Sequence, residues 1–110
     1  MSVKHLTRAR RMTTRTVGGR TVVFELRWSN RCDTNWVRVR NWPSGRTKLQ
    51  IDVSDINREV WANFAVPRPI GAGTHWGNMI YSPANNCAMG AVDYNSEHGY
   101  DVVLESSNCP

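Results

Sequence analysis

Two tryptophans and two arginines alternate near the middle of this 110-residue chain, and their pattern is typical of ligand binding. Alternate side chains of an extended strand point to the same face, so we expect one exposed face to carry Trp36, Arg38, Arg40 and Trp42. Aromatic rings and guanidinium groups together stack on bases or sugars and attract anionic groups. Arginines that merely cover tryptophan rings at a surface give the same pattern, so the strip specifies no ligand.

Two histidines, His75 and His98, are the candidates for acid–base catalysis. Either would need a carboxylate partner, such as Asp93, Glu97 or Asp101, to hydrolyse RNA or a glycoside. A structural role explains each histidine more simply, because His98 lies in a turn-like segment and His75 near the start of a strand. We therefore assign no catalytic residue and expect a protein that is not an enzyme.

Three cysteines, Cys32, Cys87 and Cys109, allow one disulfide and leave one thiol. We predict a bridge between Cys32 and Cys87, because Cys32 lies in a turn and Cys87 begins a late strand that must return beside it. This bridge would close a loop of about 55 residues and stabilise the fold by roughly 4 kcal/mol. Three reduced thiols are the alternative. The cysteine and histidine spacings match no structural zinc site, so we expect neither a metal nor a cofactor.

The charge is distributed unevenly along the chain. Residues 1–48 hold twelve lysines and arginines against two acids, whereas residues 49–110 hold two arginines against seven acids. A cationic half favours an anionic partner, such as nucleic acid, a cell-wall polymer or a lipid surface. The alternative is that the two halves neutralise each other across the fold. The longest apolar runs are only a few residues, so we expect no membrane span.

Short strands must position these residues. Residues 21–28 alternate apolar and polar side chains, and so do residues 36–42 beyond a polar turn, which predicts a β-hairpin from Thr21 to Trp42. Further alternating runs at 48–53, 60–66, 74–81, 87–94 and 100–105 are separated by turn signals. Residues 1–19 are basic and end in two glycines, and we expect a mobile arm there.

These elements predict an all-β fold. We expect a single domain over residues 20–110, built as a small antiparallel barrel or sandwich of about six to seven short strands, with residues 1–19 as the basic N-terminal arm. We favour the closed barrel slightly, because closure removes exposed sheet edges from so small a domain.

The segment VFELRWSNRCDTNWVRV, residues 23–39, resembles the signature of the YjfA-like domain of unknown function, found in small secreted proteins of Gram-positive bacteria. The later pair of segments, residues 78–81 and Cys87-Ala88, is similar to that family's second block. Cys32 and Cys87 match cysteine positions of the family, so the resemblance also implies their bridge and an extracellular location. The chain departs from the family at its N-terminus, which has neither a signal peptide nor the two further cysteines. A cytoplasmic location therefore stays open.

From these observations we expect an extracellular, non-enzymatic binding module. Its Arg/Trp strip would engage an anionic or carbohydrate polymer, such as a cell-surface glycan. The first alternative is a nucleic-acid-binding β-barrel that uses the same strip together with the N-terminal arm. The second is a small hydrolase or nuclease that uses His75 or His98. The sequence leaves the oligomeric state open.

Overall fold

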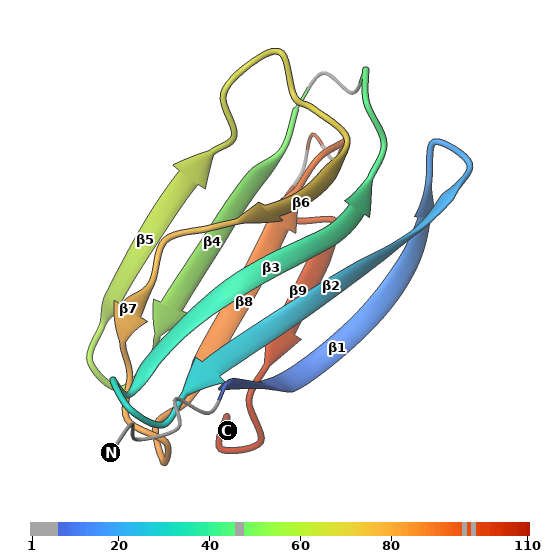
Figure 1. Ribbon diagram of the computed structural model, residues 1–110. Coiled ribbons are helices and arrows are strands. Elements are labelled where there is room, and N and C mark those ends of the chain that lie inside the picture. Colours follow the sequence, from blue (N-terminus) through green and yellow to red (C-terminus); the bar gives the residue numbers. More distant parts are fainter. Residues whose placement is uncertain (1–6, 46–47, 96, 98) are drawn as a thin grey trace, which may run out of the picture.

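The computed structural model describes residues 7–45, 48–95, 97 and 99–110, which fold into a β-sandwich without helices (Figure 1). The strands of these residues are β1 (Thr7–Val17), β2 (Arg20–Ser29), β3 (Thr34–Trp42), β4 (Gln50–Asp55), β5 (Val60–Ala65), β6 (Gly73–Trp76), β7 (Ile80–Tyr81), β8 (Ala88–Asp93) and β9 (Val102–Glu105). Within the same part of the chain, no helix is long and apolar enough to cross a membrane.

Two antiparallel sheets lie face to face (Figure 1). The first sheet has the order β1-β2-β3-β6, and β7 pairs with the beginning of β3. The second sheet has the order β5-β4-β8-β9. The central strands of both sheets follow from the period-2 patterns of the sequence, because β2, β3, β4 and β8 turn apolar side chains to the space between the sheets.

The core lies between β2 and β3 on one side and β4, β8 and β9 on the other. Its central side chains are at most 3% exposed, and they are Val22, Phe24, Leu26, Val37, Val39, Ile51, Val53, Val92, Val102 and Leu104. Gly90 of β8 permits close packing of the sheets, since an added Cβ there would lie 2.4 Å from Val37 Cγ2. A side chain at this position would force the sheets apart.

The all-β class and the hairpin from Thr21 to Trp42 are confirmed, because β2 and β3 pair in register from Val23 to Ser29. The preference for a closed barrel is wrong. The molecule is a sandwich whose two sheets remain separate, with β1 and β6 at the ends of one sheet order and β5 and β9 at the ends of the other. Short turns, such as the one at residues 18–19, join strands that are neighbours in one sheet. The alternation of side chains shows which residues face the core, but it does not show whether the sheet closes into a barrel.

The expectation of a mobile arm is wrong for residues 7–19, and residues 1–6 lie outside the described part of the chain. Residues 7–17 form β1, which pairs antiparallel with β2 from Thr7 to Val17 except at the bulge residue Arg10. Most side chains of β1 are exposed on both faces, so no apolar alternation marks it in the sequence. Its order comes from backbone hydrogen bonds to β2, which any residue except proline can make.

The two sheets carry opposite charge. The strands of the first sheet contain eight arginines and one acid, Glu25. The strands of the second sheet contain four acids and neither lysine nor arginine. Three of the four ion pairs between described residues join Glu25 to arginines of its own sheet, and Lys48–Asp93 is the fourth. Of these described ion pairs, Lys48–Asp93 alone joins the basic half of the chain to the acidic half, so neutralisation between the halves is slight.

Candidate functional site

The arginines of the predicted Arg/Trp strip surround a buried acid. Arg38 and Arg40 lie on the outer face of the first sheet, where the Nε atom of each donates to Glu25 Oε1, at 2.8 Å and 3.0 Å. Arg27 donates to Glu25 Oε2 at 3.1 Å. Glu25 is opposite Arg38 in the register of β2 and β3, and the three guanidinium groups cover its carboxylate. Both arginines of the predicted strip therefore form ion pairs with Glu25 of the protein itself.

The two tryptophans of the strip cannot serve as an exposed stacking surface. Trp36 is 6% exposed, and Trp42 is completely buried against Tyr94, with ring centroids 5.5 Å apart. The prediction that Trp42 shares a face with Arg38 and Arg40 is wrong. Asn41 adopts a left-handed φ of 65°, and the register of β3 shifts here, so the chain turns Trp42 into the core.

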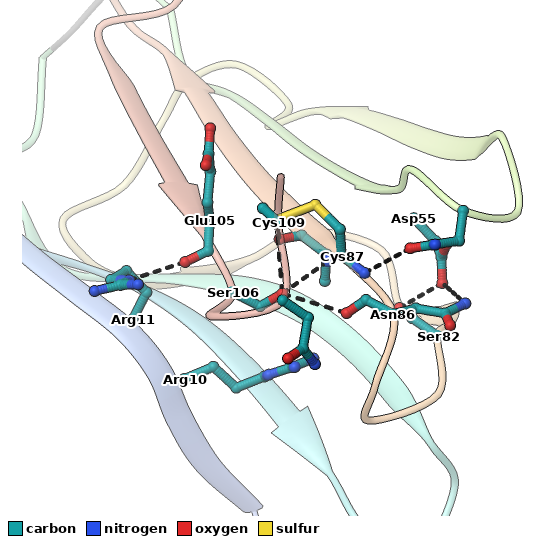
Figure 2. Close-up of a disulfide and its surroundings, with 12 residues drawn as sticks. Arg10, Arg11, Asp55, Ser82, Asn86, Cys87, Glu105, Ser106 and Cys109 are labelled. Carbon is teal, nitrogen blue, oxygen red and sulfur yellow. Dashed lines mark hydrogen bonds between the residues drawn. A yellow bond between two sulfur atoms is a disulfide. The ribbon is translucent and has the colours of Figure 1, made fainter.

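The predicted Cys32–Cys87 bridge is also wrong, because Cys87 is bonded to Cys109 and Cys32 is an exposed free thiol. Cys32 lies in the turn between β2 and β3 of the first sheet. Cys87 directly precedes β8, and the tail beyond β9 returns beside it (Figure 2). The Ser106 amide donates to the Ala88 carbonyl, and Ser106 Oγ accepts from the Ala88 amide. These bonds hold the tail where Cys109 meets Cys87.

Asp55, at the end of β4, joins two loops to the second sheet. Its fully buried carboxylate accepts hydrogen bonds from the Arg58 amide at 2.8 Å, Ser82 Oγ at 2.7 Å and Asn86 Nδ2 at 3.0 Å. Figure 2 shows Ser82 and Asn86 meeting at this carboxylate beside the disulfide. All three donors favour the ionised form, so Asp55 has a structural role at one end of the sandwich.

The pKa values of Glu25 and Asp55 predict loss of stability in acid. Burial raises each pKa, but the bonds from Arg38 to Glu25 and from Ser82 and Asn86 to Asp55 outweigh it, so both pKa values lie below their usual range. The unfolded chain thus binds protons more readily, and the free energy of unfolding should fall as the pH drops below about 4. Urea denaturation at pH 7, 4 and 3 measures this. A midpoint that stays constant down to pH 3 would contradict the assignment.

The predicted acid–base groups do not assemble around His75. Its Nε2 atom donates to the carbonyl of Gly71, just before its own strand β6, at 2.7 Å. Asp93 pairs with Lys48 at 2.6 Å, and Asp101 accepts from the Tyr94 and Asn95 amides. His98 lies outside the described residues. In the described part of the chain, no group of three or more His, Cys, Asp or Glu side chains could hold a metal ion.

A groove of about 350 Å³ runs over the outer face of the second sheet. Trp61 of β5 borders it and is 71% exposed, and Tyr100, which precedes β9, is 48% exposed. The register places Asn63, Asp52, Ala91 and Val103 in one row across the four strands. Met89 and Ser54 complete the floor beside that row. The groove thus combines aromatic rings and apolar side chains with the hydrogen-bonding side chains of Asp52, Ser54 and Asn63.

Asp52 provides the polar centre of this groove. Its carboxylate accepts a 2.7 Å hydrogen bond from Tyr100 Oη and bonds of 3.0 Å and 3.3 Å from Gln50 Nε2. The Asp52 bond, together with burial and the charges of Asp52 and Asp93, raises the pKa of Tyr100, so its hydroxyl stays protonated. Asp52 is only 6% exposed, and its neutral donors fix both the carboxylate and the Tyr100 ring.

Sequence reasoning did not identify this groove. The signal was present in β5, where Trp61 and Asn63 alternate with Val60, Ala62 and Phe64 and so must leave the core. Tyr100 and Asp52 give no comparable signal, because they meet only when β4 lies near the segment that leads into β9, with β8 between them.

No protein-family model, curated protein or solved structure significantly matches this chain. The resemblance of residues 23–39 to the YjfA-like domain of unknown function therefore stays a prediction.

Proposed function

We propose that this protein is a non-enzymatic binding module for a carbohydrate polymer, and that the groove on the second sheet is its ligand site. The observation that carries this proposal is the exposed pair Trp61 and Tyr100 at a groove centred on Asp52. The proposal keeps the ligand class expected from the sequence and moves it from the Arg/Trp strip to the opposite face of the sandwich.

The chemistry of the groove suits a sugar ring. Sugars have apolar C–H faces, which pack on indole and phenol rings, and peripheral hydroxyls that need hydrogen-bond partners. Trp61 and Tyr100 offer the rings, and the Asn63 amide and the Asp52 carboxylate offer donors and acceptors between them. Tyr100 and Gln50 already hold Asp52 in place, so little ordering of the site is needed when a ligand binds.

The charge of the second sheet favours a neutral glycan over an anionic one. Asp52 lies in the groove and Asp93 on the same outer face, while the basic residues lie mostly on the first sheet. A sulfated or uronic acid polymer would be repelled here by like charge. The nucleic-acid alternative would require the first sheet, where Arg38 and Arg40 already pair with Glu25.

An extracellular location remains part of this proposal. The Cys87–Cys109 disulfide is compatible with an oxidising compartment, where such bonds form and persist.

Replacing Trp61 by alanine should weaken binding to neutral polysaccharides by about tenfold or more, since loss of one stacked ring removes at least about 1.4 kcal/mol of binding free energy. Tyr100→Phe keeps the ring but loses the Asp52 bond, and we expect a smaller loss. Affinity electrophoresis in β-glucan, xylan, mannan and soluble chitin gels measures both effects, with heparin and RNA as anionic comparisons.

The matched control is Trp76→Ala. Trp76 is also an exposed strand tryptophan, at 55%, but it lies on the first sheet opposite Arg38. This variant should bind neutral polysaccharides as the parent does. Equal losses in both tryptophan variants would refute the groove, and so would an Arg38→Ser/Arg40→Ser variant that alone loses binding. If Trp61→Ala instead changes the mass measured by light scattering from dimer to monomer, the tryptophan belongs to a subunit interface.

A further inference from the structure

A second, polar pocket of about 410 Å³ opens where β1 begins, and it shares no lining residue with the groove. Its lining comes from β1, from the loop before β8 and from the C-terminal tail, with Arg8, Ala9, Arg10, Ala84, Ser107 and Asn108. The lining contains two arginines, a hydroxyl and an amide, and it contains no acidic side chain. This composition is that of a site for an anion.

Arg10 is held in this pocket by neutral acceptors. Its Nη1 donates to Asn35 Oδ1 at 3.2 Å and its Nη2 to the Ala84 carbonyl at 2.8 Å. Asn35 is completely buried and is itself fixed by donating to the Ser82 carbonyl. The register of β1 and β2 shifts between Ala9 and Arg11, so Arg10 has no partner residue on β2 and its side chain extends towards the loop.

Arg8 places a second positive charge at the same pocket. Its guanidinium carbon lies 5.4 Å from the centre of the Trp28 ring, a cation–π contact that orients the side chain without neutralising it. Among the residues that the structure describes, no carboxylate lies within ion-pair distance of Arg8 or Arg10. Burial and then the charge of Arg8 lower the pKa of Arg10, as expected for adjacent cations without a counter-charge.

We propose that this pocket binds a tetrahedral oxyanion, a sulfate or phosphate group, between Arg8 and Arg10. Guanidinium groups form charge-assisted, often bidentate hydrogen bonds to such oxygens, and Arg10 is already fixed in position. The bound anion supplies the negative charge that the two arginines lack. The site is independent of the groove, since none of its residues lines the second sheet's outer face.

The experiment is a titration of the parent protein with sodium sulfate and, separately, with a sulfated heparin disaccharide, at constant ionic strength set with chloride. NMR spectra of the arginine Nε–H groups and of the Ser107 and Asn108 amides report binding. We expect saturable shifts at these residues. Saturation by sulfate alone identifies the free ion as the ligand, and saturation by both identifies the sulfate group of a larger molecule as well.

The variant Arg8→Gln should weaken this binding by about tenfold, equivalent to about 1.4 kcal/mol, because half of the pocket's charge is lost. Arg8 is exposed, so the fold is retained. The matched control is Arg15→Gln on the same strand, since among the described residues the hydrogen bonds of Arg15 go to Thr13 and Thr14 of its own strand. Shifts that grow linearly without saturation overturn the site, as does an equal loss of affinity in both variants.

Discussion

Replacing Glu25 by glutamine is expected to lower the free energy of unfolding by about 3 kcal/mol. Glutamine keeps the shape of the side chain but removes the single negative charge shared by Arg27, Arg38 and Arg40. Removing one partner from a buried ion pair costs roughly 3–5 kcal/mol, because the remaining charges stay poorly solvated. We expect the lower end of that range, since the side chains of Arg38 and Arg40 remain partly in water.

Urea denaturation at pH 7 measures this effect, and Glu105→Gln is its matched control. Glu105 is also a strand glutamate, but it is exposed on β9, and its contact with Arg11 uses the backbone carbonyl. The control should therefore change the free energy of unfolding by less than about 0.5 kcal/mol. If the two glutamine variants are equally stable, the arginines do not depend on Glu25.

Removing the disulfide is the second change with a large expected effect. Replacing Cys87 and Cys109 together by serine should cost about 3 kcal/mol in the free energy of unfolding, because the bridge closes a loop with a sequence separation of 22. The tail beyond β9 should then exchange its amide hydrogens faster, since the bonds of Ser106 to Ala88 lose their covalent support.

Cys32→Ser serves as the control for this pair, because Cys32 is exposed and unbridged. It should be as stable as the parent within about 0.5 kcal/mol. Proteolysis of the non-reduced protein followed by mass spectrometry tests the pairing directly. A peptide that links Cys32 to Cys87 would contradict the structure, and so would a Cys32→Ser variant as destabilised as the double variant.

The alternation of apolar and polar residues made most of the strands predictable. Phe24 and Leu26 of β2 face Val39 and Val37 of β3, as alternation requires. Strand β1 and the turn of Trp42 into the core could not be predicted in this way, for different physical reasons. β1 buries almost no side chain, so its strand conformation follows from its backbone pairing with β2 and not from apolar alternation. At Asn41 a left-handed φ turns the following side chain, Trp42, to the opposite face of β3. An asparagine in an alternating run does not by itself indicate this conformation.

The candidate sites were less predictable, because each depends on contacts between distant segments. Alternation places Glu25 of β2 on the same face of the sheet as Arg38 and Arg40, so it was a possible partner for them. Its burial also depends on Arg27, which the alternation pattern does not show. The groove needs Asp52 and Tyr100, which are 48 positions apart. The disulfide needed the path of the C-terminal tail, which has no alternating pattern after Glu105.

The opposite charges of the two sheets make the molecule an electric dipole directed across the sandwich. The arginines of β1, β2 and β3 form its positive side, and Asp52, Asp93 and Glu105 lie on its negative side. Near a negatively charged surface, such a molecule rotates before contact and approaches with its arginines first. The groove then points away from that surface, and it remains open to a neutral ligand that arrives from solution.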